Sequence, residues 1–257
     1  MNQTVLITGA SSGIGYELSK IFAMNGYDLV LVSRTKSELE ILAEELADKN
    51  NIQAKAIPKD LSKNTAAQEL YDEIVSSGVE ISVLVNNAGF ALNGNFVDLS
   101  TEGQLDQLQL NISSLTILCK LFGKDMAKRG DGKILNVASI AAFQAGPFMS
   151  TYYASKAYVL SFSEGINNEL KKFGVQVSVL CPGPTHTKFG ERAKMKNAKI
   201  LNGPWVMNAK DVAEIAYSGL MKRKRIIIPG YINNFLAFST RLIPRSFAAL
   251  ICRYLNK

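Results

Sequence analysis

The sequence predicts an α/β protein built on a single doubly wound, Rossmann-type parallel sheet of about seven strands with helices on both faces. Two observations favour this class. Short apolar runs alternate with amphipathic stretches, and no linker rich in Pro, Gly or Ser divides the 257 residues. Right-handed crossovers assemble such an alternation into one sheet. We expect residues 1–230 to form the body of one domain and residues 231–257 to form an amphipathic extension of it.

The individual elements follow from the spacing of apolar residues. Residues 4–7 form a short apolar run, as expected of a strand buried on both faces. A helix follows and stops at Asn25-Gly26, and a second run at 29–32 precedes a helix with one apolar stripe. The alternation then predicts strand 53–57, helix 64–77, strand 81–85, helix 103–129, strand 133–137, helix 152–173, strand 175–180, helix 209–222 and strand 225–228.

Composition narrows the function classes. The net charge of +7 invites a nucleic-acid interpretation, but the basic residues are clustered and no ribonucleoprotein motif, zinc-finger spacing or repeat accompanies them. We therefore expect no nucleic-acid partner. A basic rim that attracts phosphorylated cofactors, acyl carriers or anionic lipid is the better interpretation. The clusters are Lys188, Arg192, Lys194, Lys196 and Lys199, then residues 222–225, and then Arg241, Arg245, Arg253 and Lys257.

Cysteine and histidine usage argues against disulfides and metal. The three cysteines are widely scattered with no paired spacing, and the chain opens without a charged leader and cleavage site. We expect a cytoplasmic protein, with attachment to the inner face of a membrane as an alternative. His186 is the lone histidine, so we expect no metal site and interpret it as a loop residue.

A glycine-rich turn lies between the first strand and the first helix. Backbone N–H groups at a helix N-terminus bind anions, and glycine lets a pyrophosphate approach closely. The spacing is Gly-x-x-x-Gly-x-Gly, which differs from the common dinucleotide fingerprint. An ordinary turn is the alternative, but the strand before it and the helix after it favour a nucleotide. The candidate cofactor residues here are Gly9, Ser11, Ser12, Gly13, Ile14 and Gly15.

The ends of the next strands carry further candidates. The second strand ends in Arg34 with no carboxylate nearby, so a 2′-phosphate can pair with the guanidinium, and NADP(H) is favoured while NAD(H) remains possible. A solvated surface arginine is the alternative. Asp60-Leu61 follows the third strand, where it can contact an adenine edge or cap the next helix. Asn87, Ala88 and Gly89 follow the fourth strand, where open parallel sheets bind ligands.

Tyr152 and Lys156 are candidate catalytic residues for proton transfer. On a helix, positions four apart share a face, so the Lys156 ammonium can sit beneath the Tyr152 phenol and lower its pKa. Such a phenol exchanges a proton with an alcohol or ketone oxygen. Tyr153 is the competing acid, but it would face elsewhere on the helix.

These motifs together resemble the short-chain dehydrogenase/reductase family from Thr8 to about Pro229. The resemblance implies that Tyr152 is the acid/base, that Ser139 orients the substrate oxygen, and that Lys156 holds the nicotinamide ribose while lowering the phenol pKa. It further implies a water-bridged proton relay through Asn111, pro-S hydride transfer, and a homodimer or homotetramer formed through helices 103–129 and 152–173. It also places one late segment against the nicotinamide and phosphates, namely Pro182, Gly183 and Thr187.

The segments that set specificity in this family are apolar here. We expect a small lipophilic ketone or aldehyde, such as a 3-oxoacyl chain or a steroid-like ring system, to be reduced to an alcohol with NADPH. Alcohol oxidation is the first alternative, and a non-catalytic dinucleotide-binding regulator is the second. Residues 184–204 fit neither helix nor strand and are expected to form a lid. The apolar positions are Phe90, Ala91, Leu92, Ile140, Ala141, Ala142, Phe143, Pro147, Phe148, Met149, Phe189, Trp205 and Met207.

The tail is an amphipathic segment too short and polar to span a membrane. Phe247, Leu250, Ile251 and Tyr254 fall on one face at helical spacing. Packing of this face on the domain is the favoured interpretation. Weak association with an anionic membrane surface and an oligomer contact are the alternatives.

Overall fold

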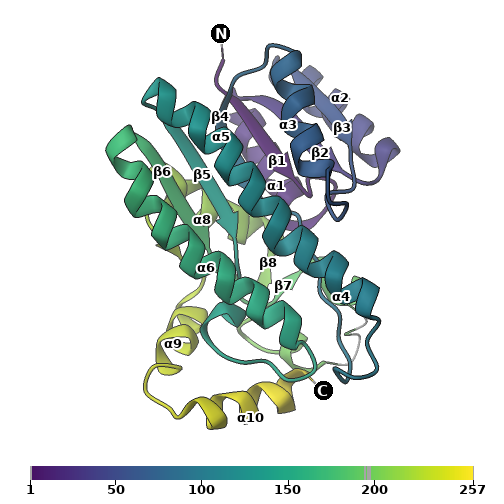
Figure 1. Cartoon of the computed structure of the whole chain (residues 1–257), viewed down its shortest axis with the longest axis vertical. Coiled ribbons are helices and arrows are strands. Elements are labelled where there is room, and N and C mark those ends of the chain that lie inside the picture. The colour runs from purple at the N-terminus through teal and green to yellow at the C-terminus, as the bar shows by residue number, and fades with distance from the viewer. Residues whose placement is uncertain (1, 194, 196–197, 257) are drawn as a thin grey trace.

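The computed structural model describes residues 2–193, 195 and 198–256, and its centre is one parallel sheet (Figure 1). The strand order is β3-β2-β1-β4-β5-β6-β9, which confirms the doubly wound Rossmann-type fold. The switch point lies between β1 and β4, where Ile7 pairs with Leu31 on one side and Val85 on the other. The strands are β1 Thr4–Thr8, β2 Asp28–Ser33, β3 Ala54–Pro58, β4 Ile81–Asn86, β5 Gly132–Val137, β6 Val175–Leu180 and β9 Ile226–Ile227.

Helices cover both faces of this sheet. One apolar core joins the sheet to α1, α2 and α8, and a second joins the opposite face to α3, α5 and α6. Strand residues alternate between the two cores, since Val5 and Ile7 belong to the first and Leu6 to the second. The helices are α1 Gly13–Met24, α2 Lys36–Asn50, α3 Ala66–Ser76, α4 Thr101–Leu108, α5 Leu115–Arg129, α6 Ser150–Leu170 and α8 Ala209–Met221.

The helix predicted over residues 103–129 is interrupted. A π-helical turn, Gln109–Ser114, separates α4 from α5. This turn contains Asn111, whose side chain accepts a hydrogen bond from the Phe90 N–H and donates one to the Phe90 carbonyl oxygen. Hydrophobic periodicity does not reveal such a turn, because the apolar face continues on both sides of it.

The segment predicted as a lid contains only short elements. β7 Thr185–His186 pairs in parallel with β8 Met207–Asn208, and between them lie α7 Phe189–Arg192 and a 3-10 turn at Lys199–Leu201. Of the basic positions in this segment, Lys194 and Lys196 lie outside the described residues.

The tail forms two helices, α9 Tyr231–Ser239 and α10 Arg245–Asn256, at the carboxyl ends of the strands (Figure 1). The prediction that Phe247, Leu250 and Tyr254 pack on the domain is wrong, because their side chains are more than half exposed. The buried positions of α10 are small or polar instead, at Ala248, Cys252 and Asn256. Within the described part of the chain, no helix is long and apolar enough to cross a bilayer.

Candidate active site

The glycine turn leaves the N-terminus of α1 open. Ser12 precedes the helix without a side-chain capping bond, and the first turn carries no acidic residue. The first N–H groups of a helix have no intrahelical partner and attract an anion. Gly9 and Gly13 have φ angles of +68° and +59°, a region that favours glycine. At Gly15 a Cβ atom would lie 2.3 Å from the Gly9 carbonyl oxygen, so no larger residue fits there.

A hydrogen-bond network ties this turn to the end of β4. The Thr8 hydroxyl accepts from the backbone N–H groups of Asn87 and Ala88, both at 3.0 Å. The Asn87 side chain donates back to the carbonyl oxygens of Thr8 and Gly9. These bonds hold the two segments side by side, so the structure brings together the candidate residues on both sides of the switch point.

The π-helical turn places Asn111 beside the segment that follows β4. Its amide donates to the Phe90 carbonyl oxygen at 3.0 Å and to the Ser155 hydroxyl at 3.1 Å. A Cβ atom at Gly89 would lie 3.1 Å from Asn111 Oδ1 and 3.5 Å from Lys156 Nζ. Asn111 and Lys156 therefore present their polar ends to one small space beside Gly89.

Ser139 and Tyr152 meet at the end of β5. Ser139 begins a 3-10 turn, where its hydroxyl accepts from the Ala141 N–H at 3.1 Å and donates to the Pro182 carbonyl oxygen at 3.3 Å. Burial raises the pKa of the Tyr152 phenol to about 12, while hydrogen bonding with Ser139 opposes that rise. The phenol is therefore protonated at neutral pH.

Burial and the hydrogen bond with Ser139, and not Lys156, account for the pKa of the Tyr152 phenol in this structure. The Lys156 ammonium donates to the Val137 carbonyl oxygen at 2.8 Å and lies 5.7 Å from the centre of the Tyr152 ring. Lys156 is itself buried, and desolvation lowers its pKa to about 8. Helical spacing places the two side chains together, and burial is the largest cause of the pKa shift in each of them.

Tyr153 points to a different partner, as predicted. Its hydroxyl donates to Asn256 Oδ1 at 3.1 Å, and burial raises its pKa. The Asn256 side-chain amide donates to the Pro147 carbonyl oxygen at 3.0 Å. The backbone carbonyl oxygen of Asn256 accepts from the Asn93 side chain at 3.2 Å. The end of α10 is thus anchored beside the candidate catalytic helix.

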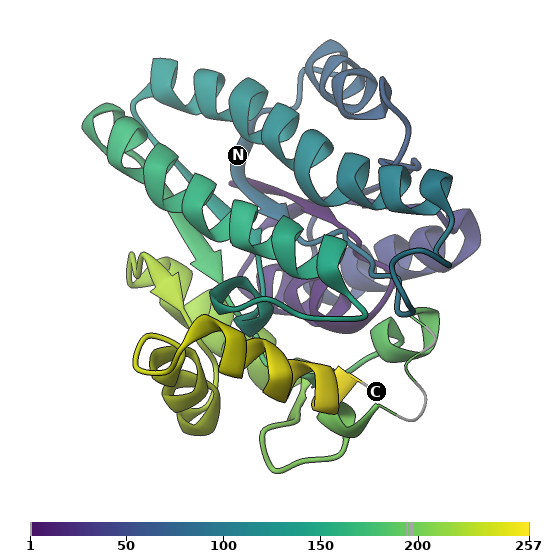
Figure 2. The ribbon, with the colours of Figure 1, turned by 60° about the horizontal axis from the view of Figure 1, so that its bottom comes forward.

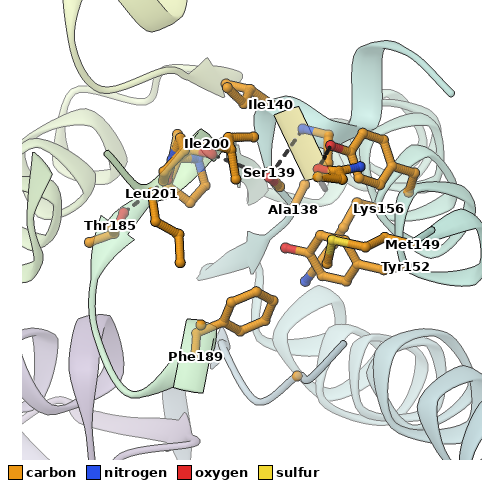
Figure 3. A pocket seen from close by; sticks show the side chains of 18 of the residues that line it. Ala138, Ser139, Ile140, Met149, Tyr152, Lys156, Thr185, Phe189, Ile200 and Leu201 are labelled. Atoms are coloured by element: carbon orange, nitrogen blue, oxygen red, sulfur yellow. Dashed lines mark hydrogen bonds between the residues drawn. The ribbon is translucent and has the colours of Figure 1, made fainter. Parts of the chain in front are cut away.

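One cavity of about 350 Å³ runs from the glycine turn past Ser139, Tyr152 and Lys156 to the tail helices. Figure 3 shows Tyr152 and Met149 on one side of it, with Leu201 across from them. The Phe189 ring lies 5.4 Å from the Tyr152 ring, so the lid segment covers the phenol. Among the other candidates, Pro182, Gly183 and Thr187 line the cavity, as do Phe90, Ile140, Ala141 and Trp205.

Several expected wall residues are not part of the cavity, and others were missed. The sequence suggested many apolar neighbours of the motifs, but seven of them do not line it: Ala91, Leu92, Ala142, Phe143, Pro147, Phe148 and Met207. Ala91 is buried in the small core beside the site without lining the cavity. One missed residue, Gln144, follows the 3-10 turn after Ser139. The others come from the lid and the tail, and for the tail the amphipathic pattern was the available signal: Met195, Ile200, Leu201, Leu236, Ile243, Ala248, Ile251, Cys252, Leu255 and Asn256.

Five cofactor candidates do not line this cavity, namely Ser11, Gly15, Arg34, Asp60 and Leu61. Arg34 follows β2 with an exposed side chain. Asp60 accepts from the Ser62 N–H at 3.0 Å and hydroxyl at 2.8 Å, so it closes a local turn and does not cap α3. The Leu61 side chain is buried in the core, and its carbonyl oxygen accepts from Ser114. A cofactor contact at Leu61 can therefore involve the backbone alone.

The family model for short chain dehydrogenases matches residues 3–198. The chain belongs to the short-chain dehydrogenase family. This is a family of oxidoreductases that act on CH–OH groups with NAD(P).

Three similar proteins illustrate the range of the family. The chain is 36% identical over 187 residues to 17-beta-hydroxysteroid dehydrogenase type 3 of Rattus norvegicus, covering 71% of this chain and 60% of that protein. It is 30% identical to the very-long-chain 3-oxoacyl-CoA reductase of Anas platyrhynchos over 264 residues, covering 98% and 82%. A solved short-chain dehydrogenase from Sphingobium yanoikuyae in complex with NADPH is 34% identical with a TM-score of 0.84, covering 93% of each chain.

The residues of this short-chain dehydrogenase fit a dinucleotide. The uncapped N-terminus of α1 provides donors for phosphate, and glycines at positions 9, 13 and 15 keep side chains away from it. Ser12, Asn87 and Ala88 line the same end of the cavity. No three metal-ligating side chains gather anywhere in the described residues, and His186 is exposed on β7.

Gly13→Ala is expected to weaken dinucleotide binding in this short-chain dehydrogenase. The new Cβ atom would lie 2.8 Å from Thr187 Cγ2 and would push the segment after β6 off the glycine turn. Gly26→Ala is the matched control, because Gly26 also has a positive φ of +75° but nothing within 4 Å. Both variants should lose about 1 kcal/mol of stability from backbone strain. Fluorescence titration with NADPH should separate them, and equal affinity in the two variants would contradict the steric argument.

Proposed function

We propose that this chain is an NADPH-dependent reductase that converts a lipophilic ketone or aldehyde to an alcohol. The observation that carries the proposal is the buried, protonated Tyr152 phenol, which sits with Ser139 in an apolar cavity continuous with the glycine turn. A protonated phenol is the form that can donate a proton to a carbonyl oxygen, as reduction requires. The alternative of alcohol oxidation would need the phenolate.

The side chains of this site would act on the substrate oxygen. Reduced nicotinamide, when bound, supplies a hydride to the carbonyl carbon. As negative charge grows on the carbonyl oxygen, the Ser139 hydroxyl donates a hydrogen bond to it and Tyr152 transfers its proton, which completes the alcohol. Lys156 would hold the nicotinamide ribose, and Asn111 would support a water-bridged path that returns a proton towards Lys156 and Tyr152. Burial under Phe189 keeps bulk water from the phenol.

The dinucleotide would lie along the carboxyl ends of β1, β2 and β4. Gly9, Ser11, Ser12, Gly13 and Ile14 would contact the pyrophosphate region, while Gly15 packs against the turn. Asn87, Ala88 and Gly89 would pass beside the ribose. On the opposite side, the segment Pro182 to Thr187 would lie against the nicotinamide. Asp60 and the Leu61 backbone would contact the adenine from outside the cavity.

Arg34 supports a preference for NADP(H). It follows β2 where an acidic residue would bind the ribose of NAD, and its exposed guanidinium is free to pair with a 2′-phosphate. Arg34→Ala is expected to raise KM for NADPH about tenfold or more while changing KM for NADH little. Lys36→Ala removes a nearby exposed charge that pairs with Glu40 and is the matched control. An equal effect of Arg34→Ala on both cofactors would reject the preference.

The cavity walls support a lipophilic substrate. Met149, Phe189 and Leu201 surround the space in front of Tyr152, and Trp205 also lines the cavity. Arg192 also lines the cavity, in keeping with a basic rim for a carrier phosphate. The hydroxysteroid and 3-oxoacyl-CoA named for the two curated relatives are both bulky and lipophilic. A homodimer or homotetramer formed through α5 and α6 stays a prediction from the resemblance.

A panel of carbonyl compounds tests this substrate class. NADPH oxidation is followed with 3-oxoacyl thioesters of increasing chain length, with steroid ketones and with small polar ketones. We expect kcat/KM to rise with apolar size, since each buried methylene contributes about 0.8 kcal/mol. Higher efficiency with small polar ketones would reject the lipophilic substrate. Tight NADPH binding without turnover of any compound would favour a non-catalytic regulator.

A further inference from the structure

The tail helices expose an unusually apolar surface. We define the outer tail face as the large apolar side chains of α9, α10 and their connection that are more than half exposed. Tyr231 at 96% exposed and Leu242 at 73% are more accessible than most apolar residues of a folded domain. The outer tail face comprises Tyr231, Phe235, Phe238, Leu242, Phe247, Leu250 and Tyr254.

The outer tail face is not needed to hold the helices in place. Other residues of α9, α10 and their connection line the cavity, namely Leu236, Ile243 and Ile251, and none of the seven outer residues does so. Two buried asparagines anchor the helices. Asn233 donates to the carbonyl oxygens of Pro229 and Trp205, and Asn256 bonds Tyr153. The outer tail face therefore presents apolar area that the fold itself leaves uncovered.

The charged side chains of the tail helices and their connection are all positive. Arg241, Arg245 and Arg253 are all exposed, and residues 231–256 contain no Asp or Glu. No ion pair involves these arginines in the part of the chain that the structure describes. Aromatic and aliphatic side chains interspersed with arginines are typical of helices that lie in a membrane interface, where the guanidinium groups contact lipid phosphates.

We propose that the outer tail face docks on the surface of an anionic phospholipid bilayer. A second copy of the chain fits the charges poorly, because an isologous contact would bring the same three arginines together with no acidic partner. A bilayer supplies both requirements of the surface, an apolar layer for the aromatic residues and anionic headgroups for the arginines. Figure 2 shows α10 running along the outside of the molecule, where such a surface can reach it. The inference does not depend on turnover.

Vesicle co-sedimentation of the full chain tests this proposal. Phosphatidylcholine vesicles with phosphatidylserine are compared with phosphatidylcholine alone, and we expect the protein to pellet only with the anionic vesicles. Phe235→Ser with Leu250→Ser should weaken binding about a hundredfold by removing apolar area. Arg241→Gln with Arg245→Gln should weaken it about thirtyfold by removing two charges. Phe96→Ser with Val97→Ser is the matched control, because both residues are exposed elsewhere, at 64% and 87%.

The outcomes separate a bilayer from other partners. Circular dichroism and thermal melting should show that the variants stay folded, since the replaced side chains are exposed. No pelleting with anionic vesicles, or equal pelleting of wild type and both tail variants, would overturn the proposal. Light scattering measures whether the protein is a monomer or a dimer. A dimer that dissociates in Phe235→Ser with Leu250→Ser, without vesicle binding, would overturn the proposal and assign the surface to a second copy.

Discussion

Tyr152→Phe is expected to lower kcat/KM for carbonyl reduction by about 10² to 10⁴ while leaving NADPH affinity unchanged. The substitution removes one oxygen from a side chain that is 9% exposed, so the ring still packs against Phe189. The variant lacks the phenol proton, which burial holds on Tyr152 by raising its pKa. Steady-state kinetics measures the loss, and fluorescence titration measures dinucleotide binding independently.

Tyr153→Phe is the matched control for that experiment. Tyr153 is the adjacent buried tyrosine, and its hydroxyl donates to Asn256. Its loss should cost about 1 kcal/mol of stability and leave activity within an order of magnitude of wild type. Activity lost in Tyr153→Phe but retained in Tyr152→Phe would show that the wrong tyrosine has been assigned as the acid.

Lys156→Met is expected to abolish reduction and yet stabilise the fold at neutral pH. The ammonium is buried and its pKa falls from 10.5 to about 8, which corresponds to about 3 kcal/mol of unfavourable desolvation. The lost hydrogen bond to the Val137 carbonyl oxygen offsets about 1 kcal/mol of the gain. Denaturant unfolding should therefore show a net stabilisation of about 2 kcal/mol. NADPH affinity should fall, because Lys156 is proposed to hold the ribose.

The pH dependence identifies the cause of this stabilisation. Between pH 8 and 10.5 the unfolded chain binds more protons at Lys156 than the folded chain does, so wild-type stability rises with pH across that window. Below pH 8 the penalty is fully present. The advantage of Lys156→Met should accordingly shrink as pH rises from 8 to 10.5. Lys49→Met, at an exposed position on α2, should change stability by less than about 0.5 kcal/mol at any pH. A pH-independent advantage of Lys156→Met would refute the explanation.

Most of the fold could be predicted because the strands are short apolar runs and the helices have clear apolar stripes. The candidate site could be located because its motifs follow the ends of parallel strands, and parallel strands end at one edge. Gly9, Asn87, Ser139 and Tyr152 all line one cavity for this reason. The pKa directions could not be predicted, since spacing places Lys156 near Tyr152 but does not reveal how deeply both are buried.

The tail shows a second limit of pattern-based prediction. Apolar residues at helical spacing normally indicate the buried face of a helix. In α10 the buried face consists of Ala248, Cys252 and Asn256, which carry little hydrophobic signal. The pattern identified the amphipathic helix correctly, but of its apolar face only Ile251 lines the cavity, and the asparagine that anchors the helix lies on the side with the weaker signal.

Hydride transfer to a bulky ketone tests the central claim most directly. NADPH deuterated at the pro-S position of the nicotinamide is incubated with the protein and a steroid ketone or long-chain 3-oxoacyl thioester, and the product is analysed by mass spectrometry. We expect one deuterium on the carbinol carbon with wild type and none above background with Tyr152→Phe. Bound NADPH with no alcohol formed from either ketone would contradict the assignment of this cavity as a reductase site, and an alcohol without deuterium would contradict pro-S transfer.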